Sequence, residues 1–226
     1  MEQRLAGKRV LVTQADDFMG PITVQVFREH GAEVVADTSD LTDPDAAQRV
    51  VDECGYVDVL VANLASPANS GTATVTVDED QWQRVFDVMV HPLHRLTRAV
   101  LPQMTERRSG KIVVYGSATG VKGMGGVAAY STARSAQVGY VRSVGIEAAG
   151  HNVQINLIAQ NYVENEQYYP PKVLENPKFQ EHLRNFVPAG RIATAREDAM
   201  FALFLASDES DFFVGQAIPF SGGWAQ

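Results

Sequence analysis

Cysteine is almost absent from this sequence, in which Cys54 is the single thiol among 226 residues. One cysteine cannot form a disulfide within the chain, which favours a reducing compartment. Long apolar runs are missing as well, and none approaches the roughly 20 residues that cross a membrane. Residues 1–8 are polar and lack the apolar core of a secretion signal. We therefore expect a soluble, cytoplasmic protein with no membrane partner.

Basic residues are scarce, because 19 Lys and Arg stand against 27 Asp and Glu, for a net charge of -8. Nucleic-acid binding needs clustered cations for the phosphates, so no nucleic-acid partner is expected. Histidine is also rare. His91 and His94 have helical spacing but lack a nearby third ligand, so no metal site is expected. The 45% apolar content suffices for the core of one domain over residues 1–226.

Short apolar runs alternate with segments of helical spacing along the chain. The runs predict buried strands at residues 9–13, 33–36, 58–62, 111–115, 154–158 and 217–220. The segments between them predict helices at residues 21–30, 43–54, 78–104, 129–149 and 196–205. This alternation predicts a single α/β domain with a doubly wound parallel sheet and helices on both faces.

Three local signals refine this pattern. Asp43, followed by a proline, and Asp78 are predicted to cap the helices that follow them. Pro92 lies inside the longest helical segment and is expected to kink or split it. Residues 66–76 form a polar loop, and residues 161–188 form a long polar and aromatic excursion with no predicted element.

Residues 117–134 contain the strongest chemical signal. Ser117 follows an apolar run, Tyr130 comes thirteen residues later, and Arg134 comes four residues after that. On a helix the last two share one face, and a guanidinium there favours phenolate and lowers a phenol pKa that is normally about 10. With a hydrogen bond from Ser117, this arrangement is typical of a general base with an orienting group. Taken alone, Tyr130 and Arg134 are better explained as a stacked surface pair, but the strand-end serine and the glycine-rich connection favour a site.

These motifs, with Asn63 after a predicted strand and paired glycines near the C-terminus, resemble the short-chain dehydrogenase/reductase family over nearly the whole chain. The resemblance implies a Rossmann-like fold and assembly into dimers or tetramers. That family binds NAD(P) through a Thr-Gly-x-x-x-Gly-x-Gly turn, whereas residues 13–20 read Thr-Gln-Ala-Asp-Asp-Phe-Met-Gly. Gln14 and Phe18 replace glycines that let a backbone approach pyrophosphate, so we expect no cofactor.

A branch of that family, the halohydrin (haloalcohol) dehalogenases, resembles the chain more closely. The shared positions are Thr13, Phe18 and Gly20 in the turn, and Ser117, Tyr130 and Arg134 beyond it. The resemblance implies a carbon–halide lyase without a redox cofactor. It would convert a vicinal haloalcohol into an epoxide, a halide ion and a proton, or open the epoxide with halide, azide, cyanide or nitrite. Assembly is implied to be homotetrameric.

The same resemblance assigns roles to individual residues. Tyr130 would take the substrate hydroxyl proton, Arg134 would hold the phenolate, and Ser117 would orient the oxygen. A leaving halide needs a nest of donors beyond the strand ends. The backbone amides of the loop after the fifth strand would supply these donors. The Phe18 ring would form an apolar wall of the halide site, although Phe18 taken alone also fits a residue packed in the core. That loop contains Gln160, Asn161, Tyr162 and Val163, and the implied substrate pocket adds Thr119, Met124 and Tyr169.

Two other functions fit the residues. An unusual NAD(P)-dependent oxidoreductase of the same family predicts measurable dinucleotide binding. A non-catalytic member that binds a ligand predicts that Ser117, Tyr130 and Arg134 can be replaced without consequence.

Overall fold

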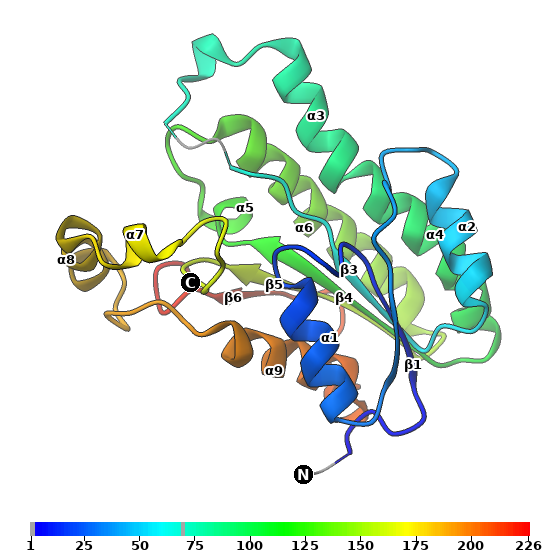
Figure 1. The fold of residues 1–226 in the computed structure, drawn as a ribbon. Helices are drawn as coiled ribbons and strands as arrows, with labels where there is room; N and C mark the ends of the chain where they lie inside the picture. Colours follow the sequence, from blue (N-terminus) through cyan, green and yellow to red (C-terminus); the bar gives the residue numbers. More distant parts are fainter. Residues whose placement is uncertain (1–2, 69–70) are drawn as a thin grey trace.

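A computed structural model describes residues 3–68 and 71–226 of the chain. The predicted loop at residues 66–76 and the predicted domain range 1–226 each include residues outside these bounds, and that range stays a prediction. Figure 1 shows one sheet between two layers of helices. Its strands are β1 (Arg9–Val12), β2 (Glu33–Ala36), β3 (Val59–Asn63), β4 (Gly110–Ser117), β5 (Val153–Gln160) and β6 (Ala217–Phe220).

The helices fill the intervals between the strands. They are α1 (Gly20–Glu29), α2 (Ala46–Cys54), α3 (Glu79–Met89), α4 (His91–Glu106), α5 (Thr119–Lys122), α6 (Ala128–Ala149), α7 (Pro171–Leu174), α8 (Pro177–Phe186) and α9 (Ala195–Ala206), with short 3-10 helices η1 (Thr74–Thr76) and η2 (Asp208–Ser210). No helix in the described ranges is both long and apolar enough to cross a membrane.

The strands lie in the order β2-β1-β3-β4-β5-β6, and all neighbours are parallel. This is the predicted doubly wound parallel sheet, so the fold prediction is confirmed. Parallel strands place all their carboxyl ends at one edge, and the order reverses between β1 and β3. Ligands of open α/β sheets bind in the crevice beyond that edge.

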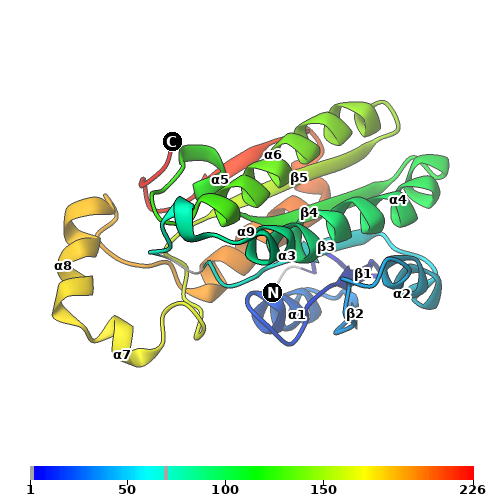
Figure 2. The same ribbon diagram turned by 90° about the horizontal axis from the view of Figure 1, so that it is seen from above.

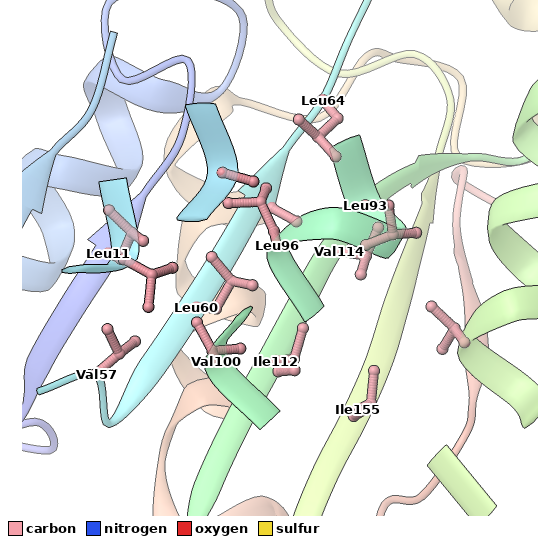
Figure 3. Packing of buried hydrophobic residues seen from close by; sticks show 14 of the residues in the cluster. Leu11, Val57, Leu60, Leu64, Leu93, Leu96, Val100, Ile112, Val114 and Ile155 are labelled. Atoms are coloured by element: carbon pink, nitrogen blue, oxygen red, sulfur yellow. The ribbon is translucent and has the colours of Figure 1, made fainter. Parts of the chain in front are cut away.

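Two apolar layers hold the helices on the sheet. One face of β3 and β4 presents Leu60 and Ile112 to Leu96 and Val100 of α4, and all four side chains are fully buried (Figure 3). The opposite face packs against α1 and α9. Because both faces are covered, the central strands are continuous apolar runs, which is the pattern that the sequence analysis used.

Several element boundaries differ from the predictions. The helix expected from Asp43 begins at Ala46, because the Asp43 carboxylate instead accepts the Asp45 amide at 3.0 Å and pairs with Arg49 at 2.6 Å. The predicted cap at Asp78 is confirmed, since its side chain accepts the Gln81 amide at 2.7 Å.

Two longer segments also differ. The helical region predicted at residues 78–104 is split into α3 and α4, with Pro92 in the first turn of α4, where a missing amide costs nothing. The excursion at residues 161–188, predicted without elements, contains α7 and α8. These helices project from the body of the molecule beyond the edge of the sheet (Figure 2).

Candidate active site

Ser117 is the last residue of β4 and lies at the carboxyl edge of the sheet. Its side chain is buried, and its Oγ lies 3.2 Å from the amide of Thr119, which donates to it, and 3.0 Å from the Thr119 hydroxyl. The chain turns at once into α5, whose Gly120 touches α6. A Cβ at Gly120 would lie 2.7 Å from the carbonyl carbon of Arg134. Glycine therefore lets α5 approach α6 closely enough to bring Ser117 towards that helix.

Tyr130 and Arg134 lie one turn apart on α6, as their spacing predicted. Both side chains are buried, and the Arg134 Cζ lies 5.0 Å from the centroid of the Tyr130 ring. This separation is within the range of a cation–π contact. The predicted proximity of guanidinium and phenol is confirmed.

Neutral oxygens hold the guanidinium in place. Arg134 Nη1 donates to the carbonyl oxygens of Leu64 and Tyr115, each at 3.0 Å, and to Gln137 Oε1 at 2.9 Å. Gln137 is itself fixed, because its Nε2 donates to the Met89 carbonyl at 2.8 Å. No carboxylate pairs with Arg134 in the described residues. Its positive charge is therefore available to Tyr130.

The ionisation of Tyr130 reflects this setting. Burial raises the pKa of the phenol. The charge of Arg134 and hydrogen bonding by Arg134, Ser117 and Tyr168 outweigh burial, so the pKa lies below its ordinary value. Tyr168 behaves in the opposite way, because burial raises its pKa strongly. Of the phenols around this point, Tyr130 is therefore the one prepared to lose and regain a proton.

A cavity of about 250 Å³ opens beside these groups. It lies beyond the carboxyl ends of β4 and β5, where the topology places ligands. All eleven residues singled out by the sequence analysis line it. They are Phe18, Ser117, Thr119, Met124, Tyr130, Arg134, Gln160, Asn161, Tyr162, Val163 and Tyr169. The structure thus brings the eleven residues together at one cavity, and their roles in a reaction stay predictions.

One detail of that prediction is wrong. The amides of the loop after β5 were expected to face a bound anion. The Asn161 amide instead donates to the Phe220 carbonyl at 3.0 Å, and the Tyr162 amide donates to Asn161 Oδ1 at 3.0 Å. Val163 is the residue of these three whose amide has no acceptor in the described part of the chain. The loop offers at most a small part of the expected donor nest.

Sequence reasoning also missed part of the lining. Asn63 was noted only as a strand end, yet its Nδ2 donates to the carbonyls of Gln14 and Asp17, both at 2.9 Å, and fixes the turn after β1. Tyr168 also lines the cavity. Its hydroxyl donates to the Ser66 carbonyl at 2.8 Å, and its ring lies 5.7 Å from that of Phe18. Asn165 lines the cavity without any sequence signal.

Comparison with known proteins shows the ancestry of this fold. A family model described as enoyl-(acyl carrier protein) reductase matches residues 3–225. The chain belongs to the short-chain dehydrogenase/reductase family. Among curated members, it is similar to the 3-oxoacyl-[acyl-carrier-protein] reductase of Thermotoga maritima, with 30% identity over 97% of this chain and 98% of that protein. The corresponding reductase of Vibrio harveyi is 28% identical, with the same coverage.

Solved structures give the same picture. A 3-oxoacyl-[acyl-carrier protein] reductase from Brucella melitensis is 25% identical and covers 100% of this chain with 94% of its own, at a TM-score of 0.89. A structure named as a dehalogenation enzyme is 29% identical and covers 98% of this chain with 100% of its own, at a TM-score of 0.88. The short-chain dehydrogenase/reductase fold therefore extends over the whole described chain.

These relatives correct the functional prediction. The expectation of a carbon–halide lyase that needs no redox cofactor is wrong, because the full-length curated relatives are 3-oxoacyl reductases, which favour an NAD(P)-dependent oxidoreductase. The physical reason is that a buried serine and tyrosine in this arrangement are suited to position and protonate a substrate oxygen. That task is common to different reactions, so these residues do not specify which bond is broken.

The turn after β1 nevertheless departs from the short-chain dehydrogenase/reductase pattern. Gln14 and Phe18 adopt positive φ angles of 43° and 47°, which favour glycine. The Gln14 side chain accepts the Ala65 amide at 2.7 Å and donates to the Ala65 carbonyl at 3.3 Å, so it ties the turn to the chain after β3. Of the three glycines in the family's turn pattern, the one at Gly20 is kept in this chain. A Cβ there would lie 2.2 Å from the Gln14 carbonyl oxygen, so a larger residue would collide with the turn.

The donors of this turn do not fit a pyrophosphate. The Phe18 amide donates to Asp17 Oδ1 at 2.8 Å, and the amides of Asp17 and Gly20 donate to carbonyls within the turn at 3.1 Å and 2.8 Å. Asp16 and Asp17 add negative charge where phosphates would lie. The residues present therefore do not reproduce the amide cradle that holds a dinucleotide in this fold.

Proposed function

We propose that this protein is an atypical NAD(P)-dependent oxidoreductase that interconverts a carbonyl group and an alcohol, with Tyr130 exchanging the proton on the substrate oxygen. The observation that carries the proposal is the buried Tyr130, its pKa lowered by Arg134, at a cavity in a chain that resembles reductases along its full length. It is atypical because the turn after β1 lacks the pyrophosphate cradle. Proton transfer and substrate binding are therefore assigned here to side chains of the protein, and no step is assigned to the cofactor.

Proton transfer follows from the geometry around Tyr130. A substrate oxygen in the cavity lies within reach of the Tyr130 and Ser117 hydroxyls, which both line it. In the reductive direction Tyr130 donates its proton to the oxygen as negative charge develops there, and Arg134 stabilises the phenolate that remains. In the oxidative direction the phenolate takes the proton from the alcohol. Ser117 holds the oxygen in both directions, and its contact with Thr119 orients its hydroxyl.

The remaining cavity residues are proposed to bind the substrate. Phe18 and Tyr168 form an aromatic wall, and Thr119, Met124 and Tyr169 line the substrate side. Residues 160–163 face the same space and are proposed to contact a polar or anionic group of the substrate. A volume of about 250 Å³ suits a small molecule.

We propose separately that the chain belongs to a particular branch of the short-chain dehydrogenase/reductase family. Phe18 and Arg134 are among the positions that the chain shares with the dehalogenase branch, and a solved dehalogenation enzyme is 29% identical at a TM-score of 0.88. These observations support a common branch with that enzyme. The proposal concerns ancestry, and carbon–halide cleavage is not assigned to this chain.

Assembly and location are proposals as well. Ile146 on α6 is 75% exposed and Phe212 is fully exposed, which leaves large apolar side chains uncovered on one subunit. We propose a homo-oligomer, a tetramer by resemblance, in the cytoplasm. Light scattering of the purified protein tests the assembly, and a monomer at working concentration would contradict it.

Turnover with a nicotinamide cofactor tests the main proposal. Purified protein is mixed with NADPH or NADH and with 3-oxoacyl thioesters or small ketones, and oxidation of the cofactor is followed by absorbance. We expect turnover by the native protein and its loss in Tyr130→Phe. Tyr140→Phe, on the outer part of the same helix, is the matched control and should keep full activity. Absence of turnover with every substrate, together with halide and proton release from a vicinal haloalcohol without nicotinamide, would overturn the proposal.

A further inference from the structure

A carboxyl group behind the cavity has no role in the proton transfer described above. Asp198 lies in the first turn of α9 and is completely buried. One of its carboxylate oxygens accepts a hydrogen bond from Nε2 of Gln160 at the end of β5, and the other oxygen, Oδ1, has no partner among the described residues. Gln160 lines the cavity, so its side-chain amide connects Asp198 to the cavity.

The neighbouring hydroxyls cannot satisfy the second oxygen. Tyr115 of β4 lies close enough to Asp198 for that charge to raise its pKa further, but its hydroxyl lies 2.7 Å from that of Thr23 on α1. Thr23 donates its own proton to the Met19 carbonyl at 2.6 Å, so the Tyr115 proton is given to Thr23. Among the described residues, the ionised form of Asp198 therefore has one side-chain donor, the Gln160 amide.

No cation compensates this buried charge within the described part of the chain. On α9 itself, Arg196 pairs with Glu29 of α1 at 2.7 Å, on the solvent side of the helix. The other charged neighbour, Glu197, pairs with Arg191 at 2.7 Å.

On the neighbouring elements that the structure describes, further cations pair with other acids. On β4, Lys111 pairs with Asp211. The two acids of η2 face other cations, with Lys8 at 3.6 Å from Asp208 and Arg4 at 3.3 Å from Glu209. Burial and Gln160 are the influences that set the ionisation of Asp198.

A primary amide between such a carboxyl group and a cavity has two arrangements. When Asp198 is ionised it can only accept, so Gln160 turns its NH₂ group towards Asp198 and leaves its carbonyl oxygen for the cavity. When Asp198 carries a proton, it can donate to that carbonyl oxygen, and the NH₂ group then faces the cavity. One proton on Asp198 therefore exchanges an acceptor for a donor at the cavity wall.

We propose that Asp198 is a positioning residue that determines whether Gln160 offers a hydrogen-bond donor or an acceptor to the ligand in the cavity. The protonated state favours ligands that accept there, such as carbonyl or carboxylate oxygens. The ionised state favours ligands that donate, such as alcohols. The exchange requires the cavity and these two side chains, and it is the same whichever reaction the cavity serves.

The exchange falls in an accessible pH range. Burial without a compensating cation raises the pKa of Asp198 to about 7. Carbonyl ligands should therefore bind better on the acid side of neutrality and alcohol ligands on the alkaline side.

Carbon-13 NMR of the glutamine side-chain carbonyls tests this directly, with Gln160→Leu used to assign the Gln160 signal. We expect the Gln160 carbonyl to shift in a single step near pH 7 in the native protein, and the step to be absent in Asp198→Asn. Gln137 is the internal control, because its amide is fixed between Arg134 and Met89 and its signal should stay flat. A flat Gln160 signal in the native protein, or the same step in Asp198→Asn, would overturn the proposal.

A second measurement covers the case in which Asp198→Asn fails to fold. The side-chain carboxyl carbon of Asp198 in the native protein must titrate with the same midpoint as Gln160. A midpoint near the ordinary aspartate value of about 4 would show that the two groups are not coupled. Neither measurement requires nicotinamide or a substrate, so the result is distinguishable from a failure of the proposed oxidoreductase activity.

Discussion

Arg134 lies across the ring of Tyr130, with its Cζ 5.0 Å from the ring centroid, while its Nη1 donates only to uncharged oxygens. The buried cation is thus held by carbonyl groups and has the phenol as its electrostatic partner. Without it, burial alone would raise the pKa of Tyr130. This pair is therefore the physical basis of the proton transfer that we propose at the cavity.

Removal of the Arg134 charge should move the pH dependence of the reaction. In Arg134→Met the Tyr130 pKa rises because burial is then opposed only by hydrogen bonding from Ser117 and Tyr168, so the pH at which oxidation of an alcohol reaches half its maximum should rise. Because the phenolate is the base, each increase of one in this pKa lowers the oxidation rate at neutral pH by about tenfold. Ultraviolet titration of tyrosinate together with the pH–rate profile measures the change. Arg134→Lys should have a smaller effect, and the exposed Arg142→Met is the control. Identical profiles in all variants would contradict this role.

Loss of the Tyr130 hydroxyl should affect catalysis and leave binding nearly unchanged. Tyr130→Phe keeps the ring that lines the cavity but removes the transferable proton, so kcat should fall by about 10²- to 10⁴-fold. Affinity for a cavity ligand, measured by calorimetry, should change by no more than a few-fold. A variant that retained most of its kcat would show that Tyr130 is not the proton donor.

The turn after β1 should limit dinucleotide affinity. In the double variant Gln14→Gly and Phe18→Gly, both positive-φ positions receive the residue that favours them, and the side chains that close the turn are removed. We expect NADPH to bind about tenfold more tightly, which corresponds to about 1.4 kcal/mol.

Asn152→Gly is the matched control for that variant, because Asn152 has a φ of 56° in the turn before β5 and lies outside the cavity. Fluorescence titration with NADPH compares the variants. Unchanged affinity in the double variant would show that the turn does not set dinucleotide binding.

Asp198 should make folding stability depend on pH. Its pKa of about 7 in the folded protein lies above the ordinary aspartate value of 3.8, so between these values the folded state binds more protons than the unfolded state. Stability from this group is therefore lost as pH rises from about 4 to about 7, by about 4 kcal/mol in total.

The comparison with Asp198→Asn isolates this contribution, because an amide does not titrate. The variant should gain in stability relative to the native protein as pH increases from about 5 to about 8. Urea unfolding at both pH values provides the measurement. A stability difference that is the same at the two pH values would contradict the raised pKa.

Much of the fold could be predicted from local patterns. The strands are apolar runs because both faces of the sheet are covered, and Pro92 divides α3 from α4 because it lacks an amide. The helices α7 and α8 were missed because α7 is a single turn of 4 residues and both begin at proline within a polar, aromatic segment. The start of α2 was misjudged because Asp43 uses its carboxylate in a turn and on Arg49.

The site could be predicted as a set of residues, since parallel strands bring their ends to one edge and the Tyr130 and Arg134 spacing is local. The contacts of Asp198 and Asn63 could not. Asp198 and Gln160 form a hydrogen bond although they are 38 residues apart in the sequence, and no sequence motif in either segment predicts this contact. The reaction was misassigned for a related reason, because the spacing of Ser117, Tyr130 and Arg134 is compatible with proton transfer to an oxygen in several reactions and does not specify the accompanying bond change.

Binding of NADPH to the native protein is the most direct test of the proposed oxidoreductase function. The purified chain is titrated by fluorescence, and the same sample is then assayed for nicotinamide oxidation with a carbonyl substrate. We expect weak but saturable binding of NADPH. Turnover should be lost in Tyr130→Phe and kept in Tyr140→Phe. No binding at millimolar cofactor, combined with halide release from a haloalcohol in its absence, would contradict the oxidoreductase assignment.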